Sequence, residues 1–300
     1  MPSHDATLNA LTVDVEDYFQ VQAFADVISP LDWDRFESRV ENNTYRVLDL
    51  LAENGIKGTF FVLGWEAERR PGIVRRITGE GHELACHGYG HQLVYRIGPV
   101  AFREDVRRAK SILEDISGKP VLGYRAPSYS ITARSLWALD ILAEQGFLYD
   151  SSIVPARHDV YGIPGAPRFP YRVRCEAAEL TEFPPSTMQV GVGALKATLP
   201  VGGGGYLRLY PRALTHWGLE TINNREGHPF SVYVHPWELD PHQPKLSGSR
   251  RSRFRHYHNI HRTERDLGQL LKRFRFGPMG RVIAALDKAP IHDPRLKGAA

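Results

Sequence analysis

His87 and His91 lie four positions apart, in a short segment with glycines on both sides of its central tyrosine. On a helical turn, this spacing brings both imidazole rings to one side, which is a common arrangement at zinc sites. Two histidines alone are a weak signal. A catalytic zinc also needs a third protein ligand, usually a carboxylate, and open positions for water and substrate. The pair therefore predicts a metal site if a carboxylate can reach it.

Such a carboxylate is available in the segment Thr12-Val-Asp-Val-Glu-Asp17, at the end of an apolar run. Three acidic groups so close together would repel one another without a cation or an arginine beside them. Any of Asp14, Glu16 and Asp17 can supply the ligand at this point, and strand alternation places Glu16 on the same face as Asp14. The choice stays open, as does a plainer interpretation in which Asp14 or Asp17 caps a helix.

Ionisable residues recur at or just after the ends of the expected strands. They are Asp14, His87, Arg125, Asp150 and His235. In α/β barrels the carboxyl ends of the strands are where reacting groups gather, because the strand fixes the side chain and the loops shape a pocket. The five placements together predict one active site at this edge.

Short apolar runs alternate with stretches of helical period, which predicts βα units around a parallel sheet or barrel. The expected strands are 9–14, 58–63, 83–86, 121–124, 147–149 and 230–234. The expected helices are 42–54, 66–79, 100–116 and 132–145. Asn43 is expected to cap the first helix and Gly55 to follow its end, while Pro71 interrupts the second. The Pro- and Gly-rich stretch 155–210 is expected to form hairpins and loops.

The composition is that of an ordinary folded protein, with 42% apolar and 24% charged residues in a chain of 300. A chain of this length can bury a core without a structural metal, so a bound ion is expected to serve chemistry. Cys86 and Cys175 form no paired motif, and the sequence shows neither a signal-peptide pattern nor a membrane-spanning apolar run. We therefore expect a cytoplasmic protein without a transmembrane segment. The net charge of +4 gives no general field for nucleic acid.

The chemical groups stand in a fixed order along the chain: Thr12-Val-Asp14, His87-x-x-x-His91, Arg125-x-Pro127, Asp150-Ser-Ser152 and Val234-His235-Pro236. In this order they resemble the five motifs of the NodB-homology polysaccharide deacetylases, of the carbohydrate esterase family 4 type. The resemblance covers roughly residues 8–240, and the joint match is far more specific than any single motif. Residues 234–238 and the basic stretch beyond them look most like the bacterial branch linked to exopolysaccharide synthesis and exosortase systems.

The resemblance implies an α/β fold, namely a distorted (β/α)7 barrel of mostly parallel strands with hairpin and loop insertions. Residues 1–240 would form the catalytic domain and residues 241–300 a basic C-terminal extension packed on it. That extension contains Arg250, Arg251, Arg253, Arg255 and Arg262. Such a cluster could contact phosphate or an anionic glycan. The plainer interpretation is a solvated surface stretch.

By position, Asp14 resembles the base that deprotonates the attacking water. Arg125 resembles the partner that keeps this carboxylate ionised and oriented. His235 resembles the general acid for the leaving amine, and Asp150 resembles the group that orients His235.

His87 and His91 resemble the ligands of a divalent metal, which we expect to be zinc. The usual aspartate ligand of the first motif is replaced by Val15, so Glu16 or Asp17 must supply the third ligand.

Three further residues, Ser128, Tyr129 and Trp237, are expected to contact the substrate. Ser128 stands where the family usually has an aromatic residue, and its backbone N–H could still help to hold an oxyanion. Trp237 could stack on a sugar ring or belong to the core. Gly88 replaces the serine or threonine that usually stabilises the histidine turn.

These assignments predict a metal-dependent N-deacetylase that hydrolyses the acetamide of N-acetylhexosamine units in a bacterial polysaccharide or its precursor and releases acetate. Its partner is then an N-acetylated glycan. One alternative is an allantoinase-like hydrolase of a small amide, because a fold does not fix a function. A glycosidase with paired carboxylates would not need the histidine pair or Arg125. A non-catalytic glycan-binding protein is disfavoured by the filled catalytic positions.

Overall fold

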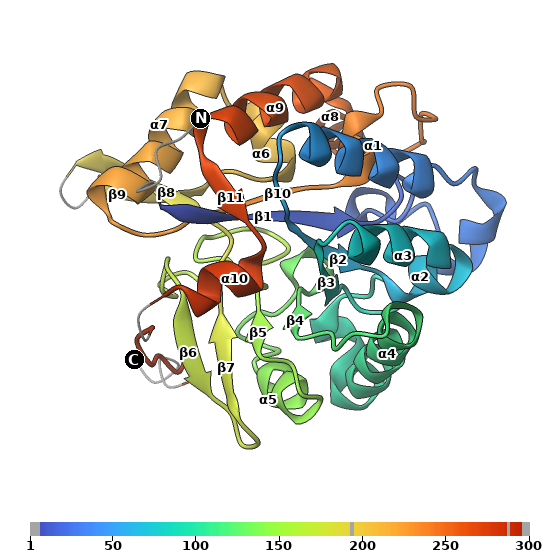
Figure 1. Ribbon diagram of the computed structural model, residues 1–300, viewed down its shortest axis with the longest axis horizontal. Coiled ribbons are helices and arrows are strands. Elements are labelled where there is room, and N and C mark those ends of the chain that lie inside the picture. The colour runs from blue at the N-terminus through green and yellow to red at the C-terminus, as the bar shows by residue number, and fades with distance from the viewer. Residues whose placement is uncertain (1–6, 193–194, 287–288, 296–300) are drawn as a thin grey trace.

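The computed structural model describes residues 7–192, 195–286 and 289–295, and a nine-stranded sheet lies at its centre (Figure 1). The strands of this sheet are β1 (Leu8–Val15), β2 (Thr59–Val62), β3 (Glu83–Cys86), β4 (Gly123–Tyr124), β5 (Tyr149–Asp150), β6 (Tyr171–Arg174), β7 (Glu179–Glu182), β10 (Ser231–Val234) and β11 (Arg275–Gly277). Their order is β10-β1-β2-β3-β4-β5-β7-β6, and β11 pairs with the start of β1. Every pairing is parallel except that of β6 with β7.

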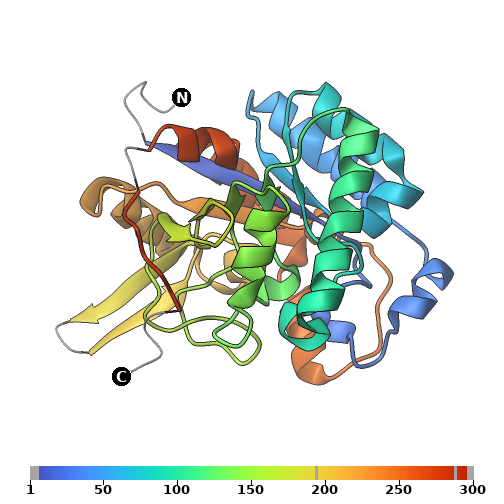
Figure 2. The same cartoon turned by 90° about the horizontal axis from the view of Figure 1, so that it is seen from below.

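Helices follow one another around the outer side of β1 to β5, each packed against a neighbouring helix (Figures 1 and 2). These helices are α1 (Val40–Glu53), α2 (Gly64–Arg69), α3 (Pro71–Gly79), α4 (Val94–Ser117) and α5 (Trp137–Glu144). The later helices are α6 (Gly204–Leu209), α7 (Arg212–Glu220), α8 (Arg250–Tyr257), α9 (Thr263–Arg273) and α10 (Met279–Ala284). No described helix combines the length and the apolar character needed to cross a bilayer.

The α/β class and the mostly parallel sheet are as predicted, but the expected barrel is not closed. The edge strands are β6 and β10, and the described residues form no ladder between them. After β5 the chain leaves the βα pattern. It forms the antiparallel hairpin of β6 and β7, then a separate hairpin of β8 (Thr187–Val192) and β9 (Leu195–Pro200). These hairpins fall within the stretch expected to hold hairpins and loops. β7 pairs in parallel with β5, but the next strand in the sheet, β6, is antiparallel to β7, and no described strand joins β6 to β10.

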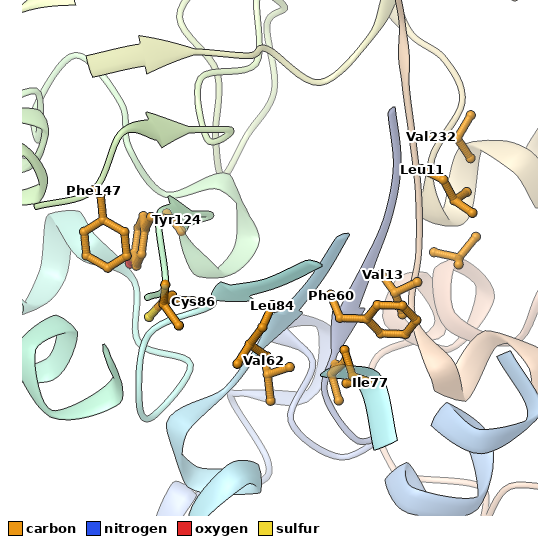
Figure 3. Close-up of a cluster of buried hydrophobic side chains, with 14 of the residues drawn as sticks. Leu11, Val13, Phe60, Val62, Ile77, Leu84, Cys86, Tyr124, Phe147 and Val232 are labelled. Atoms are coloured by element: carbon orange, nitrogen blue, oxygen red, sulfur yellow. The ribbon is translucent and has the colours of Figure 1, made fainter. Parts of the chain in front are cut away.

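The main core lies between the sheet and the α1–α5 helices (Figure 3). Its central members come from β1, β2 and β3 and include Val13, Phe60, Val62 and Cys86, all fully buried. Burial raises the pKa of the Cys86 thiol to about 12, so this residue is an inert core side chain beside the histidine segment.

The local signals at the helix ends have mixed outcomes. Gly55 follows α1 with a φ of +65°, the left-handed conformation expected after a helix end. Pro71 begins α3 and separates it from α2, as its missing N–H predicts. Asn43 does not cap α1, because the helix starts three residues earlier, at Val40. The helix expected over 100–116 likewise starts early, at Val94, with a kink at Gly98.

Candidate metal centre and catalytic site

The predicted residues meet at the carboxyl edge of the sheet. Asp14 is the second-to-last residue of β1, whereas His87, Arg125 and His235 directly follow β3, β4 and β10. Because these strands are parallel neighbours, their ends project to one side. Asp14, His87 and His235 line a hollow of about 510 Å³, and Arg125 is fully buried beneath it.

Glu16, His87 and His91 form a cluster suited to a metal ion. One ligand atom from each residue lies within 4.8 Å of the other two. His87 Nδ1 lies 2.8 Å from the backbone carbonyl of Arg125, so a proton on Nδ1 leaves the Nε2 lone pair free for a cation. Glu16 Oε2 lies 2.6 Å from His91 Nε2, and this contact needs a proton or a cation between the two atoms.

The protonation states of the cluster suit metal binding. Burial lowers the pKa of His87 to about 4, so its imidazole is neutral near pH 7. Burial acts to raise the pKa of Glu16, but the positive charges of His91 and His235 outweigh it and lower that pKa to about 2. A neutral imidazole and an ionised carboxylate are the forms that ligate metals. Two nitrogens and one oxygen are the donor set of a catalytic zinc site with open positions.

The path of the histidine segment differs from the expected helical turn. Gly88 has a φ of +75° and His91 a φ of +50°, so residues 87–91 form a loop. Asp105 on α4 holds this loop by accepting the N–H groups of Tyr89 at 2.8 Å and Gly90 at 3.2 Å. A Cβ at position 88 would lie 2.9 Å from Asp105 Oδ2, which explains the glycine there. The sequence alone gave no signal for Asp105, which lies on a distant helix.

Asp17, the other candidate for the third ligand, is not part of the cluster. Its carboxylate accepts the backbone N–H groups of Arg39 and Val40 at 2.8 and 3.1 Å, and the Ser38 hydroxyl at 2.8 Å. It therefore stabilises the start of α1, where an anion is favoured by the helix dipole. The capping interpretation fits Asp17, and Glu16 is left as the carboxylate beside the histidines.

Arg125 and Asp14 form a buried ion pair beneath the hollow. Arg125 Nη1 donates to Asp14 Oδ1 at 2.6 Å and to the Thr12 hydroxyl at 2.8 Å. Its other nitrogens donate to the carbonyl oxygen of Ser151 at 3.2 Å and to the Ser151 hydroxyl at 2.9 Å. The guanidinium, fully buried, also lies 4.2 Å above the Phe61 ring. Arg125 thus connects β1 to the loop after β5 and fixes the Asp14 carboxylate.

Arg125→Lys should lower kcat by at least about tenfold and destabilise the fold by about 1–3 kcal/mol, because a lysine cannot reach Asp14, Thr12 and Ser151 together. Acetate release and thermal unfolding check the two effects. As a control, Arg134→Lys changes an exposed arginine that makes no ion pair within the described ranges. Unchanged turnover in Arg125→Lys would show that charge alone is sufficient.

His235 is oriented by Glu238 rather than by Asp150. His235 Nδ1 lies 2.5 Å from Glu238 Oε1, and its Nε2 faces Asp14 Oδ2 at 3.9 Å and Glu16 Oε1 at 3.6 Å. Glu238 lies three residues after His235, on the short helix η5 (Pro236–Leu239), so the same turn carries both groups. The motif Val234–Glu238 contained this partner, although the sequence interpretation assigned its role to Asp150.

Asp150 instead stabilises the loop that supports Arg125. It accepts the Ser152 hydroxyl at 2.6 Å, and Glu182 on β7 accepts the N–H groups of Ser152 and Ile153 at 3.2 and 3.0 Å. Burial raises the pKa of Asp150 to about 6 and raises that of Glu182 as well. The two acids fix residues 151–153, whose first member bonds Arg125. Glu182 was not foreseen, because its partners come from another strand.

Glu238→Gln should lower kcat/KM and move the alkaline limb of the pH profile to lower pH. Burial disfavours the imidazolium of His235, but Glu16 and Glu238 outweigh it and raise the pKa of His235 to about 9. Without the Glu238 charge this pKa falls, so the acid form is lost at a lower pH. We expect a loss of at least about tenfold at pH 8. A profile with an unmoved alkaline limb would contradict this role of Glu238.

The three expected substrate residues all line the hollow, but they differ in what they can offer. Ser128 and Tyr129 have φ values of +52° and +54°, a strained backbone conformation, and both residues line the hollow. Trp237 is 5% exposed, and its ring stacks between His235 and His256, with ring centres 5.3 and 4.1 Å away. Its Nε1 donates to Glu16 Oε1 at 3.3 Å. Trp237 therefore supports the site as a core residue, and its faces are not free for a sugar.

Two family models match the chain. Residues 31–147 match the model described as polysaccharide deacetylase, and residues 151–284 match one described as a domain of unknown function (DUF3473). Residues 31–147, about two fifths of the chain, are thus similar to polysaccharide deacetylases, in agreement with the resemblance that the order of the motifs indicated.

Curated relatives carry names of the same class. The chain is 34% identical over 106 residues to a peptidoglycan-N-acetylglucosamine deacetylase of Bacillus cereus, which is 35% of this chain and 37% of that protein. It is 30% identical over 97 residues to a chitooligosaccharide deacetylase of Bradyrhizobium sp., which is 32% of this chain and 42% of that protein. The match thus spans less than half of either relative. Deacetylases are hydrolases of acetamide C–N bonds, the class predicted from the sequence.

A solved structure agrees in fold. A structure described as a candidate polysaccharide deacetylase from Mycobacterium smegmatis has a TM-score of 0.61 and covers 98% of this chain and 97% of its own. The two chains are 21% identical, so the likeness establishes the fold alone.

Proposed function

We propose that the protein is a metal-dependent N-deacetylase of N-acetylhexosamine units in a bacterial glycan. The observation that carries this proposal is the cluster of Glu16, His87 and His91 beside Asp14 and His235 in one hollow. A bound divalent cation, zinc by the donor set, would polarise the acetamide carbonyl and lower the pKa of a water molecule.

The chain's own residues supply the proton transfers. Asp14, held by Arg125, accepts a proton from the attacking water. His235, held by Glu238 and protonated below its raised pKa, donates a proton to the leaving amine. Ser128 lines the hollow, and its backbone N–H would contact the acyl oxygen. Acetate and a free amino sugar are the products.

The finer expectations from the sequence remain proposals. They are zinc as the metal, a polymer or precursor of exopolysaccharide synthesis as the substrate, a cytoplasmic location, and a boundary near residue 240 between the catalytic domain and its extension.

Product analysis tests this proposal against the small-amide alternative. Zinc-loaded protein is incubated with N-acetylglucosamine oligomers and, separately, with allantoin. We expect free acetate and an equal amount of new amino groups from the oligomers, and no ring opening of allantoin. Ring opening without acetate release would instead support the allantoinase-like activity.

A further inference from the structure

The catalytic hollow is one part of a longer cleft. It continues into a second hollow of about 370 Å³, and the two share walls formed by Tyr161, Tyr233 and Arg255. Tyr206 lines the second hollow, and its hydroxyl lies 3.0 Å from that of Tyr161. Sites for single small ligands have volumes of about 300–1,000 Å³. The two hollows together fall near the upper end of this range, which leaves room for groups of the ligand beyond the sugar at the metal centre.

The helix α8 gives one side of this cleft a positive charge. Arg251 and Arg255 line the catalytic hollow, and their side chains are 68% and 45% exposed. On the other face of α8, a third hollow of about 320 Å³ is lined by Lys245, Arg250 and Arg253 together with two aromatic residues. The cations thus continue from the cleft across the helix.

Arg251 and Arg255 share one carboxylate partner. Asp14, Glu16 and Asp26 also line the hollow, but no ion pair in the described ranges joins them to these two arginines. Asp159 lies 3.1 Å from Arg251 and 3.8 Å from Arg255, so a single negative charge is shared by two guanidinium groups. Residues 241–262 contain no Asp or Glu. Within the described ranges, none of the cations of the third hollow forms an ion pair.

Some arginines elsewhere on the surface have carboxylate partners of their own. Arg69 pairs with Asp34, and Arg76 pairs with both Asp49 and Glu80. Exposed arginines without an ion pair also occur elsewhere in the described ranges, Arg134 among them, so Arg251 and Arg255 are distinguished by their place on the wall of the catalytic hollow.

We propose that the substrate is an acidic glycan, whose carboxylate or phosphate binds Arg251 and Arg255 while its acetamide lies at the metal centre. This rests on the proposed deacetylase function. The planar guanidinium matches both carboxylate and phosphate oxygens. An anion at this point would give the two guanidinium groups, which share Asp159, a second negative partner, and their exposed side chains remain accessible to it.

Calorimetry on the metal-free protein tests whether the negative charge of the glycan, rather than its shape, determines the affinity. One probe is a hexasaccharide of alternating N-acetylglucosamine and glucuronate, and its control is the same hexasaccharide with every carboxylate methyl-esterified. We expect the acid to bind about tenfold more tightly, and added salt to weaken only this binding. Arg251→Gln with Arg255→Gln should abolish the preference. Arg75→Gln with Arg225→Gln, which removes equal charge from exposed sites outside the cleft, should retain it.

A second pair of probes tests whether the anionic group that binds the two arginines is a phosphate rather than a carboxylate. N-acetylglucosamine 1-phosphate is compared with N-acetylglucosamine, and a preference that only the Arg251/Arg255 variant loses would assign phosphate. Equal binding of charged and uncharged probes in both pairs would overturn the proposal. Acetate release from neutral oligomers by zinc-loaded protein would then still support the deacetylase. A charge preference without acetate from any probe would contradict the deacetylase and leave an anion-binding cleft.

Discussion

Replacing both histidines of the metal centre, His87→Ala with His91→Ala, should remove the metal and reduce acetate release by at least about 10³-fold, equivalent to about 4 kcal/mol of barrier. The two imidazoles supply two of the three clustered ligand atoms, and Glu16 alone cannot retain the ion. Metal analysis after dialysis should find one ion per chain in the native protein and none in the variant.

The matched control removes two histidines that line none of the cleft, His216→Ala with His261→Ala, and should keep both metal and activity. Chelation should lower the melting temperature of the native protein and of this control but not of the His87/His91 variant, because only a ligand that binds the folded state stabilises it. Equal metal content in both variants would refute the ligand assignment.

Asp14→Asn should lower kcat by at least about 10²-fold while one metal ion stays bound. The amide has nearly the shape of the carboxylate, but it cannot accept the proton of the attacking water. Its oxygen can still accept a hydrogen bond from Arg125, although the fully buried guanidinium loses its charged partner.

Thermal unfolding and metal content must accompany this measurement, because the loss of a buried ion pair can itself destabilise the chain. Near-normal turnover in a folded, metal-loaded Asp14→Asn protein would remove Asp14 from the role of base.

The edge of the sheet that carries the site was predictable because it follows from local rules. A strand end fixes the residue that follows it, so Asp14, His87, Arg125 and His235 could be placed together before any contact was known. The effects of Gly55 and Pro71 on the ends of their helices were predictable in the same way, because each residue acts through its own backbone.

Contacts between distant segments were not predictable in this way. Asp17 caps a helix that begins more than twenty residues later, and Asp105 and Glu182 hold loops from other elements. Glu238 is different, because its spacing of three from His235 was available in the sequence. The family pattern favoured Asp150 for that role, and the geometry corrects it.

Whether the sheet closes into a barrel depends on the stretch 155–210. This stretch shows no helical period from which further βα units could be predicted. β4 and β5 each hold only two paired residues, and the antiparallel hairpin of β6 and β7 then ends the sheet. Strand ends near β1 still converge, so an open sheet is sufficient to build the site.

Zinc titration into chelator-treated protein tests the central claim most directly, with acetate release from an N-acetylglucosamine oligomer as the readout. We predict no release without metal, a rise in proportion to added zinc, and saturation at one ion per chain, with none of this response in the His87/His91 variant. Release that persists after complete chelation, or zinc-dependent release that survives in that variant, would contradict catalysis at this metal centre.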